Sequence, residues 1–60
     1  MSEMLPASTV IRRIRIAGIT YEHHFGETWW RRPDGGSHSF QKMAALKREA
    51  IKKGIEITEW

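Results

Sequence analysis

The segment Trp29-Trp30-Arg31-Arg32 runs directly into Pro33-Asp34-Gly35-Gly36, and this junction constrains the fold most. Proline, aspartate and paired glycines each favour turn geometry, so extended structure before them has to end here. Along an extended strand, successive side chains point to opposite faces. We therefore expect one tryptophan of the pair to pack in the core and the other to be exposed, and the two arginines to be divided in the same way.

Residues 9–25 are rich in β-branched side chains, which predicts extended structure. The apolar residues change parity between Ile16 and Ile19, so a single in-phase strand would place some of them on the wrong face. Glycine accepts the backbone angles that a bulge needs. The prediction is one long strand with a bulge or bend at Ala17-Gly18.

A second strand and a helix are predicted next. Residues 28–32 follow the short connection Phe25-Gly26-Glu27 and would form a hairpin with the first strand. Apolar residues then recur at helical spacing, with Ser37 or Ser39 as the N-terminal cap and Gly54 as the stop. The stripe predicted to be buried consists of Phe40, Met43, Ala44, Ala50 and Ile51.

Residues 55–60 alternate between apolar and polar types, which predicts a third strand that buries Ile55 and Ile57. A right-handed crossover through the helix would make this strand parallel to the second strand and antiparallel to the first. The predicted fold class is α+β, with a small antiparallel or mixed three-stranded sheet in ββαβ order, the first strand in the middle and one helix on one face. Residues 9–60 would form this single domain, after a flexible N-terminal arm at residues 1–8.

Composition narrows the classes of function. No apolar run approaches the roughly 18 residues of a membrane span, and the amino terminus lacks a signal-peptide pattern, so we expect a cytoplasmic protein with no membrane partner. The chain has no cysteine, which excludes disulfides and a thiolate zinc site. A domain of this size often gains stability by oligomerisation, so a homodimer is an open alternative.

The histidines and serines are the candidates for metal binding or catalysis. Adjacent strand residues such as His23 and His24 face opposite ways, so at most one could join His38 at a metal, and the spacing fits no standard site. Serines that flank a histidine in a turn seldom present an oriented base and oxyanion donors. We predict a non-enzymatic protein with no metal and no cofactor. A metal-dependent enzyme built on the histidines is kept as an alternative class of function.

Basic residues are concentrated in the middle of the chain. The net charge is +3, and between residues 28 and 53 lysine and arginine clearly outnumber aspartate and glutamate. Arginines are also interleaved along the first two strands, and neighbouring strands would bring several of them onto the sheet face that the helix leaves uncovered. A basic and aromatic sheet face can enter a nucleic-acid groove or stack single-stranded bases.

Residues 18–53 resemble the small modules of three-stranded sheet plus helix at the amino end of phage-type tyrosine recombinases, and more distantly the plant AP2 domain. The resemblance rests on Ile19-Thr20-Tyr21, on Trp29-Trp30-Arg31-Arg32-Pro33-Asp34-Gly35-Gly36, and on Ser37-His38-Ser39-Phe40 before an alanine-rich helix. It implies that residues 37–40 form a short third strand. Because the family inserts its sheet into the DNA major groove, it also implies DNA contacts from Tyr21, His23, Trp30 and Arg32, or from their opposite-parity neighbours. The strand expected at residues 55–60 departs from the family pattern, so a recombinase role is not implied.

The sequence thus predicts a small non-catalytic nucleic-acid-binding protein of phage or mobile-element type, with DNA as the expected nucleic acid. The predicted contact residues are Arg12, Arg13, Arg15, Tyr21, His23, Trp30, Arg31, Arg32 and Lys42. The alternative is a protein-interaction module, an inhibitor or adaptor of a host protein, that uses an exposed tryptophan and an open sheet edge.

Overall fold

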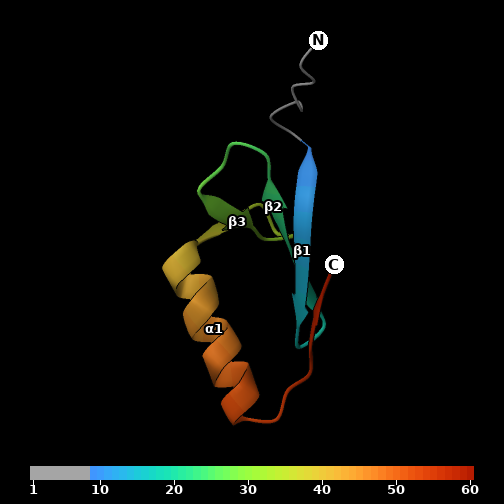
Figure 1. Ribbon diagram of the computed structural model, residues 1–60, viewed down its shortest axis with the longest axis vertical. Helices are drawn as coiled ribbons and strands as arrows, with labels where there is room; N and C mark the ends of the chain where they lie inside the picture. Colours follow the sequence, from blue (N-terminus) through green and yellow to red (C-terminus); the bar gives the residue numbers. More distant parts are fainter. Residues whose placement is uncertain (1–8) are drawn as a thin grey trace.

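The computed structural model describes residues 9–60, which form five strands and one helix (Figure 1). The elements are β1 (Val10–Ile16), β2 (Ile19–His24), β3 (Trp29–Arg31), β4 (Ser37–Ser39), α1 (Phe40–Lys52) and β5 (Ile57–Glu59). All strands belong to one sheet in the order β4-β3-β2-β1-β5, and every neighbouring pair is antiparallel. The α+β class is confirmed, whereas the predicted count of three strands is wrong. The arm predicted at residues 1–8 lies outside the described residues.

The long bent strand predicted for residues 9–25 is a β-hairpin. Ala17 and Gly18 form its two-residue turn, with φ angles of 53° and 81°, the left-handed values that such tight hairpin turns require. Ile16 and Ile19 are directly paired across this turn and so share a face. The change in parity therefore comes from chain reversal and not from a bulge at this point. The irregularity in the β1–β2 register lies between Val10 and Arg12.

A short strand, β4, forms where the residue pattern predicts a helix cap and the family resemblance implies a strand. Residues 32–36 form a turn, so the Pro-Asp-Gly-Gly junction lies within a β3–β4 hairpin. Ser39 ends β4 and also caps α1, because its hydroxyl accepts a hydrogen bond from the backbone N–H of Lys42 at 3.1 Å. The two roles proposed for the serine-rich segment are both present.

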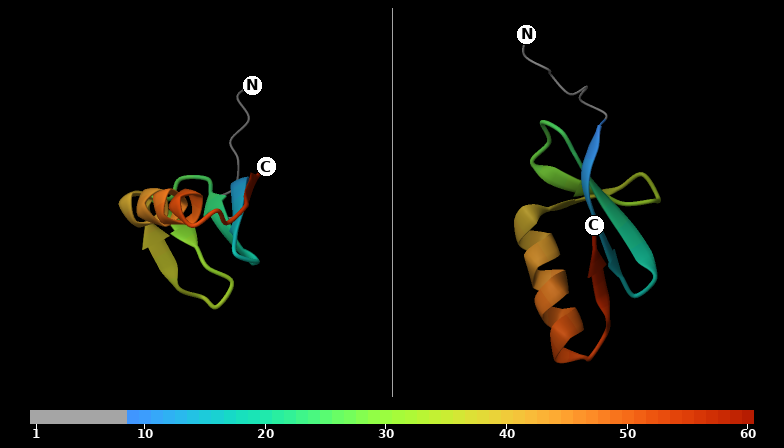
Figure 2. Two further views of the ribbon diagram at one scale, coloured as in Figure 1. Left: turned by 90° about the horizontal axis from the view of Figure 1, so that it is seen from below. Right: turned by 45° about the vertical axis from the view of Figure 1, so that its right-hand side comes forward.

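The helix links the two opposite edges of the sheet, β4 and β5. It ends at Lys52 with Lys53 as its C-terminal cap, and Gly54 follows with a φ of 74°, as predicted. β5 then pairs antiparallel with β1, also as predicted. Because neighbouring strands alternate in direction, β5 runs parallel to β4 and opposite to β3. The sequence analysis predicts β5 to be parallel to the strand at residues 28–32, which is β3, so that prediction is wrong. Figure 2 shows α1 lying along one side of the twisted sheet.

The core lies between α1 and one sheet face. Its buried residues are Ile14, Ile16, Tyr21, Trp30, Met43 and Ala50, with Leu46 and Ile57 partly buried against them. Trp30 is 6% exposed and Trp29 is 41% exposed, so the parity prediction for the tryptophan pair is confirmed.

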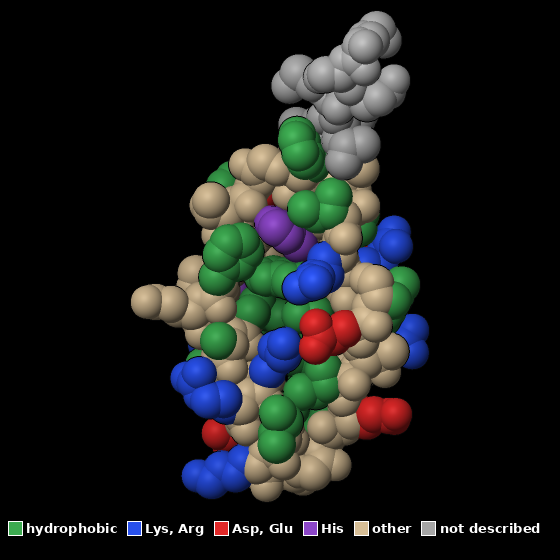
Figure 3. All heavy atoms as spheres, in the orientation of Figure 1, with side chains coloured by type: hydrophobic (Ala, Val, Ile, Leu, Met, Phe, Trp, Pro, Cys, Tyr) green, Lys and Arg blue, Asp and Glu red, His purple; other side chains and the backbone are tan. Residues whose placement is uncertain are grey.

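The buried stripe of the helix was predicted only in part. Met43, Leu46 and Ala50 face the core, which is an i, i+3, i+7 pattern. Phe40 is 46% exposed and Ile51 is 69% exposed. Ala44 and Ile55 are exposed as well. The reason is that α1 contacts β4 and β3 at one side of the sheet and β5 at the other, so it does not cover the sheet evenly. A band of apolar side chains remains visible beside the helix (Figure 3).

Candidate nucleic-acid interface

The sheet face opposite α1 is uncovered within the described residues, and we call it the open face. Cross-strand partners share a face, and Glu22 pairs with both Arg13 on β1 and Arg31 on β3. The backbone of Trp60 continues this row, because it exchanges hydrogen bonds of 2.7 and 3.0 Å with that of Arg13. The side chains assigned to the open face by pairing and parity are Arg13, Arg15, Thr20, Glu22, His24, Trp29, Arg31, Thr58 and Trp60.

Four of the predicted contact residues lie on the other face. Tyr21 and Trp30 are buried in the core, and Arg12 on β1 lies opposite His23 on β2 in the strand register. The imidazole of His23 stacks edge-on against Phe40, with ring centroids 5.2 Å apart. The residues named first by the family resemblance therefore occupy the helix side. Their opposite-parity neighbours are the ones on the open face.

Lys42 lies apart from the open-face arginines, and Arg32 only borders their face at the β3–β4 turn. Both line a hollow beside the β3–β4 turn, together with Tyr21 and His38. Arg32 is ion-paired with Asp34. The hydrogen bond from the backbone of Gly36, at 2.9 Å, and then the Arg32 pair lower the pKa of Asp34. Arg32 thus stabilises its own turn, and the structure brings only Arg13, Arg15 and Arg31 of the predicted set together on the open face.

Glu22 is the centre of the open face. Its Oε1 lies 3.1 Å from His24 Nε2, and its Oε2 lies 3.3 Å from Arg13 Nε. The hydrogen bond with His24, and then that with Arg13, hold the pKa of Glu22 below its ordinary value although burial acts in the opposite direction. Because an ionised carboxylate only accepts hydrogen bonds, His24 Nε2 must donate here. The negatively charged carboxylate of Glu22 therefore lies in the row between Arg13 and Arg31.

Arg31 is held by a second carboxylate. Its Nε donates to Glu27 Oε1 at 3.0 Å, and this hydrogen bond lowers the pKa of Glu27 and raises that of Arg31. The backbone carbonyl of the same glutamate lies 2.8 Å from His23 Nε2 on the helix side. The connection between β2 and β3 is thus fixed from both faces of the sheet.

Arg15 differs from the other two arginines. It is exposed, and among residues 9–60 no carboxylate lies within ion-pair distance of it. Its guanidinium carbon lies 5.8 Å from the ring centroid of Trp60, a cation–π geometry. Arg15 and Trp60 together present a charged fork beside an aromatic ring that is 53% exposed.

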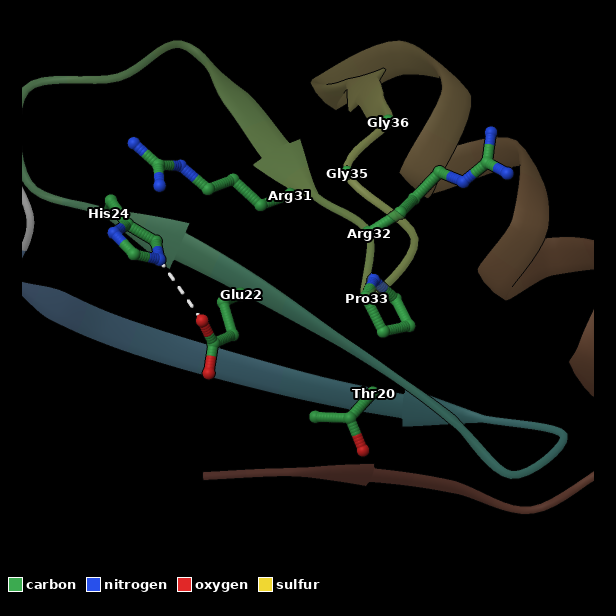
Figure 4. Close-up of a pocket in the computed structure, with 8 residues that line it drawn as sticks. All are labelled: Thr20, Glu22, His24, Arg31, Arg32, Pro33, Gly35 and Gly36. Atoms are coloured by element: carbon green, nitrogen blue, oxygen red, sulfur yellow. Dashed lines mark hydrogen bonds and ion pairs between the residues drawn. The ribbon is translucent and has the colours of Figure 1, made fainter.

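A cleft of about 530 Å³ lies over part of the open face. Thr20, Glu22 and His24 follow one another along β2 as its floor, and the cleft is bounded by Arg31, Arg32, Pro33, Gly35 and Gly36 (Figure 4). His24 is buried, and its Nδ1 has no hydrogen-bond partner among the described residues. A Cβ on Gly36 would lie 3.2 Å from Arg32 and Asp34 side-chain atoms, so a larger residue there would require these two side chains to shift.

Sequence reasoning missed Glu22, His24 and Trp60 as members of this surface. The signal that could have found Glu22 and His24 is the Ala17-Gly18 turn, because recognising it fixes Glu22 opposite Arg13 by simple register. His23 and His24 do face opposite ways, as parity predicted. Across residues 9–60, no group of three or more His, Cys, Asp or Glu side chains lies close enough together to hold a metal ion.

Comparison with protein-family models, curated proteins and solved structures gives no significant match. The resemblance to recombinase modules therefore stays a prediction. The helix described here is too short and too polar to cross a membrane.

Proposed function

We propose that this protein binds nucleic acid, with DNA as the expected ligand, through the open face and without catalysis. The observation that carries the proposal is the presence of Arg13, Arg15 and Arg31 on one uncovered sheet face together with Trp29 and Trp60. Guanidinium groups bind phosphate oxygens in a forked geometry, and exposed aromatic rings stack on bases. The arrangement supplies both kinds of contact.

The two carboxylates on this face decide which arginine contributes most. Arg13 and Arg31 would have to exchange Glu22 and Glu27 for a phosphate. The Arg13–Glu22 pair is partly exposed on both sides, and such pairs contribute little to stability, so its exchange is feasible. Arg15 needs no exchange, because no described carboxylate pairs with it. We therefore assign the main phosphate contact to Arg15 and base stacking to Trp60.

Binding of fluorescein-labelled duplex and single-stranded DNA, measured by anisotropy across a salt series, tests the proposal. The affinity of the wild-type chain should fall steeply with salt, with a slope of roughly 0.9 per duplex phosphate neutralised. Arg15→Glu should weaken binding and reduce that slope by about one or more. Arg48→Glu is the matched control, since it makes the same charge change at an exposed helix position. Absence of DNA binding by the wild-type chain at low salt, or equal losses in the two variants, would refute the proposal.

The second candidate function is a protein-interaction module. It is favoured by the exposed ring of Trp29 and by β4, which forms an edge of the sheet. Edge strands and exposed aromatic residues are common sites of protein recognition. A stoichiometric partner that is lost on Trp29→Ser and retained by Arg15→Glu would favour this function over nucleic-acid binding.

A further inference from the structure

A second concave surface lies on the helix side of the sheet, away from the open face. It is a groove of about 550 Å³ between α1 and β1. Ile14, Trp30 and Met43 form its floor, and all three are buried. Its apolar walls come from Ile11 on β1 and from Phe40 and Ala44 on α1. In Figure 3 apolar side chains run down this face, with charged side chains beside them.

The groove follows from how the helix is anchored. α1 contacts β4 and β3 on one side and β5 on the other. The amino-terminal part of β1, before its pairing with β5 begins, is left without a covering element among the described residues. As a result Ile11 is 47% exposed, and Phe40 on the opposite wall is exposed to nearly the same extent. Bulky apolar side chains gathered around a concavity are typical of a binding surface.

The charges at the rim indicate what the groove accepts. Lys47 on α1 and Glu59 on β5 form an ion pair of 3.1 Å that bridges the two walls. Arg12 also lines the groove, is exposed, and has no carboxylate within ion-pair distance among residues 9–60. Within the described residues, the rim therefore carries a positive charge that no carboxylate pairs with, beside an apolar floor.

We propose that this groove binds a short segment of another protein in which a bulky apolar side chain is flanked by acidic residues. The apolar side chain lies over Trp30 between Phe40 and Ile11, and the acidic flank faces Arg12. A second copy of this chain is the poorer occupant, because symmetric pairing of two grooves would bring like charges on the two rims together. A partner of opposite charge removes that repulsion and gains from steering.

A displayed library of random dodecamer peptides, selected on the immobilised full-length chain, tests this inference. Enriched peptides should share a Leu, Phe or Trp with Asp or Glu neighbours. In ¹⁵N–¹H spectra, the best synthetic peptide should shift the amides of Phe40 and Ala44 and leave Arg15 and Thr20 unchanged. Failure to enrich any peptide, enrichment without acidic residues, or shifts confined to the open face would each overturn the proposal.

Two matched pairs of variants locate the binding. Ala44→Lys places a long side chain in the groove and should weaken the peptide by about tenfold or more, whereas Ala45→Lys makes the same change outside the groove. Arg12→Glu should weaken it by about threefold or more through lost charge complementarity, with Arg48→Glu as the control. Circular dichroism verifies that each variant is folded. Equal affinities within both pairs would show that the groove is not the binding site.

Discussion

Trp30 is the side chain whose removal should most damage this fold. It is 6% exposed and belongs to the core with Ile14, Tyr21 and Met43. A tryptophan of this kind buries on the order of 150–250 Å², which at about 25 cal/mol per Å² corresponds to roughly 4–6 kcal/mol as an upper estimate. Measured Trp→Ala substitutions in cores cost about 3–5 kcal/mol. A domain of this length has a total stability of roughly 3–9 kcal/mol, so Trp30→Ala should remove most of it.

Urea denaturation followed by circular dichroism measures this loss. Trp29→Ala is the matched control, because the same residue type one position away is 41% exposed. We expect it to cost about 1 kcal/mol or less. If Trp30→Ala does not fold, Trp30→Leu keeps much of the apolar volume and should still lower the midpoint more than Trp29→Leu does. Similar losses for the two positions would refute the assignment of opposite faces to this pair.

Three further outcomes follow from particular contacts. The pKa of Glu22 is lowered below 4.5, chiefly by the His24 hydrogen bond. The ionised carboxylate therefore stabilises the fold above that pH, and this stabilisation is lost as the pH falls below it. The difference in urea midpoint between wild type and Glu22→Gln should be larger at pH 7 than at pH 3. Gly54→Val should lower stability by more than about 1 kcal/mol because φ is 74° there, and a neutral result would contradict the helix end described. Ile51→Glu should leave the thermal midpoint nearly unchanged, because Ile51 is exposed, whereas Ala50→Glu should unfold the domain, because Ala50 is buried. Equal effects of the two substitutions would mean that the buried stripe of the helix is misassigned.

Elements with a strong local signal could be predicted from the sequence. The helix, its serine cap and its glycine stop each have a simple stereochemical cause, and the division of Trp29 from Trp30 needs only strand parity. These features depend on a few neighbouring residues and not on the rest of the fold.

The missed elements lack such a signal. A change of parity is compatible with a bulge or with a two-residue turn, and Ala17-Gly18 has alanine where tight hairpin turns usually have Asn, Asp or Gly. β4 is only three polar residues long and has no apolar alternation. The open face could be predicted in part, since Arg13 and Arg15 of β1 share it with Arg31 of β3. Its carboxylates depend on the register of the hairpin, which the sequence pattern alone left ambiguous.

The anchoring of the two sheet edges by one helix has a consequence for the order of folding. The β1–β2, β2–β3 and β3–β4 pairings each join neighbouring segments, so they close short loops at low entropic cost. The pairing of Arg13 with Trp60 instead closes a loop that contains nearly the whole domain. Because the entropic cost of closing a loop rises with its length, we expect this pairing to form last. The backbone amide of Trp60 should therefore exchange with deuterium faster than that of Tyr21 in the middle strand, because the last contact to form is the first to open.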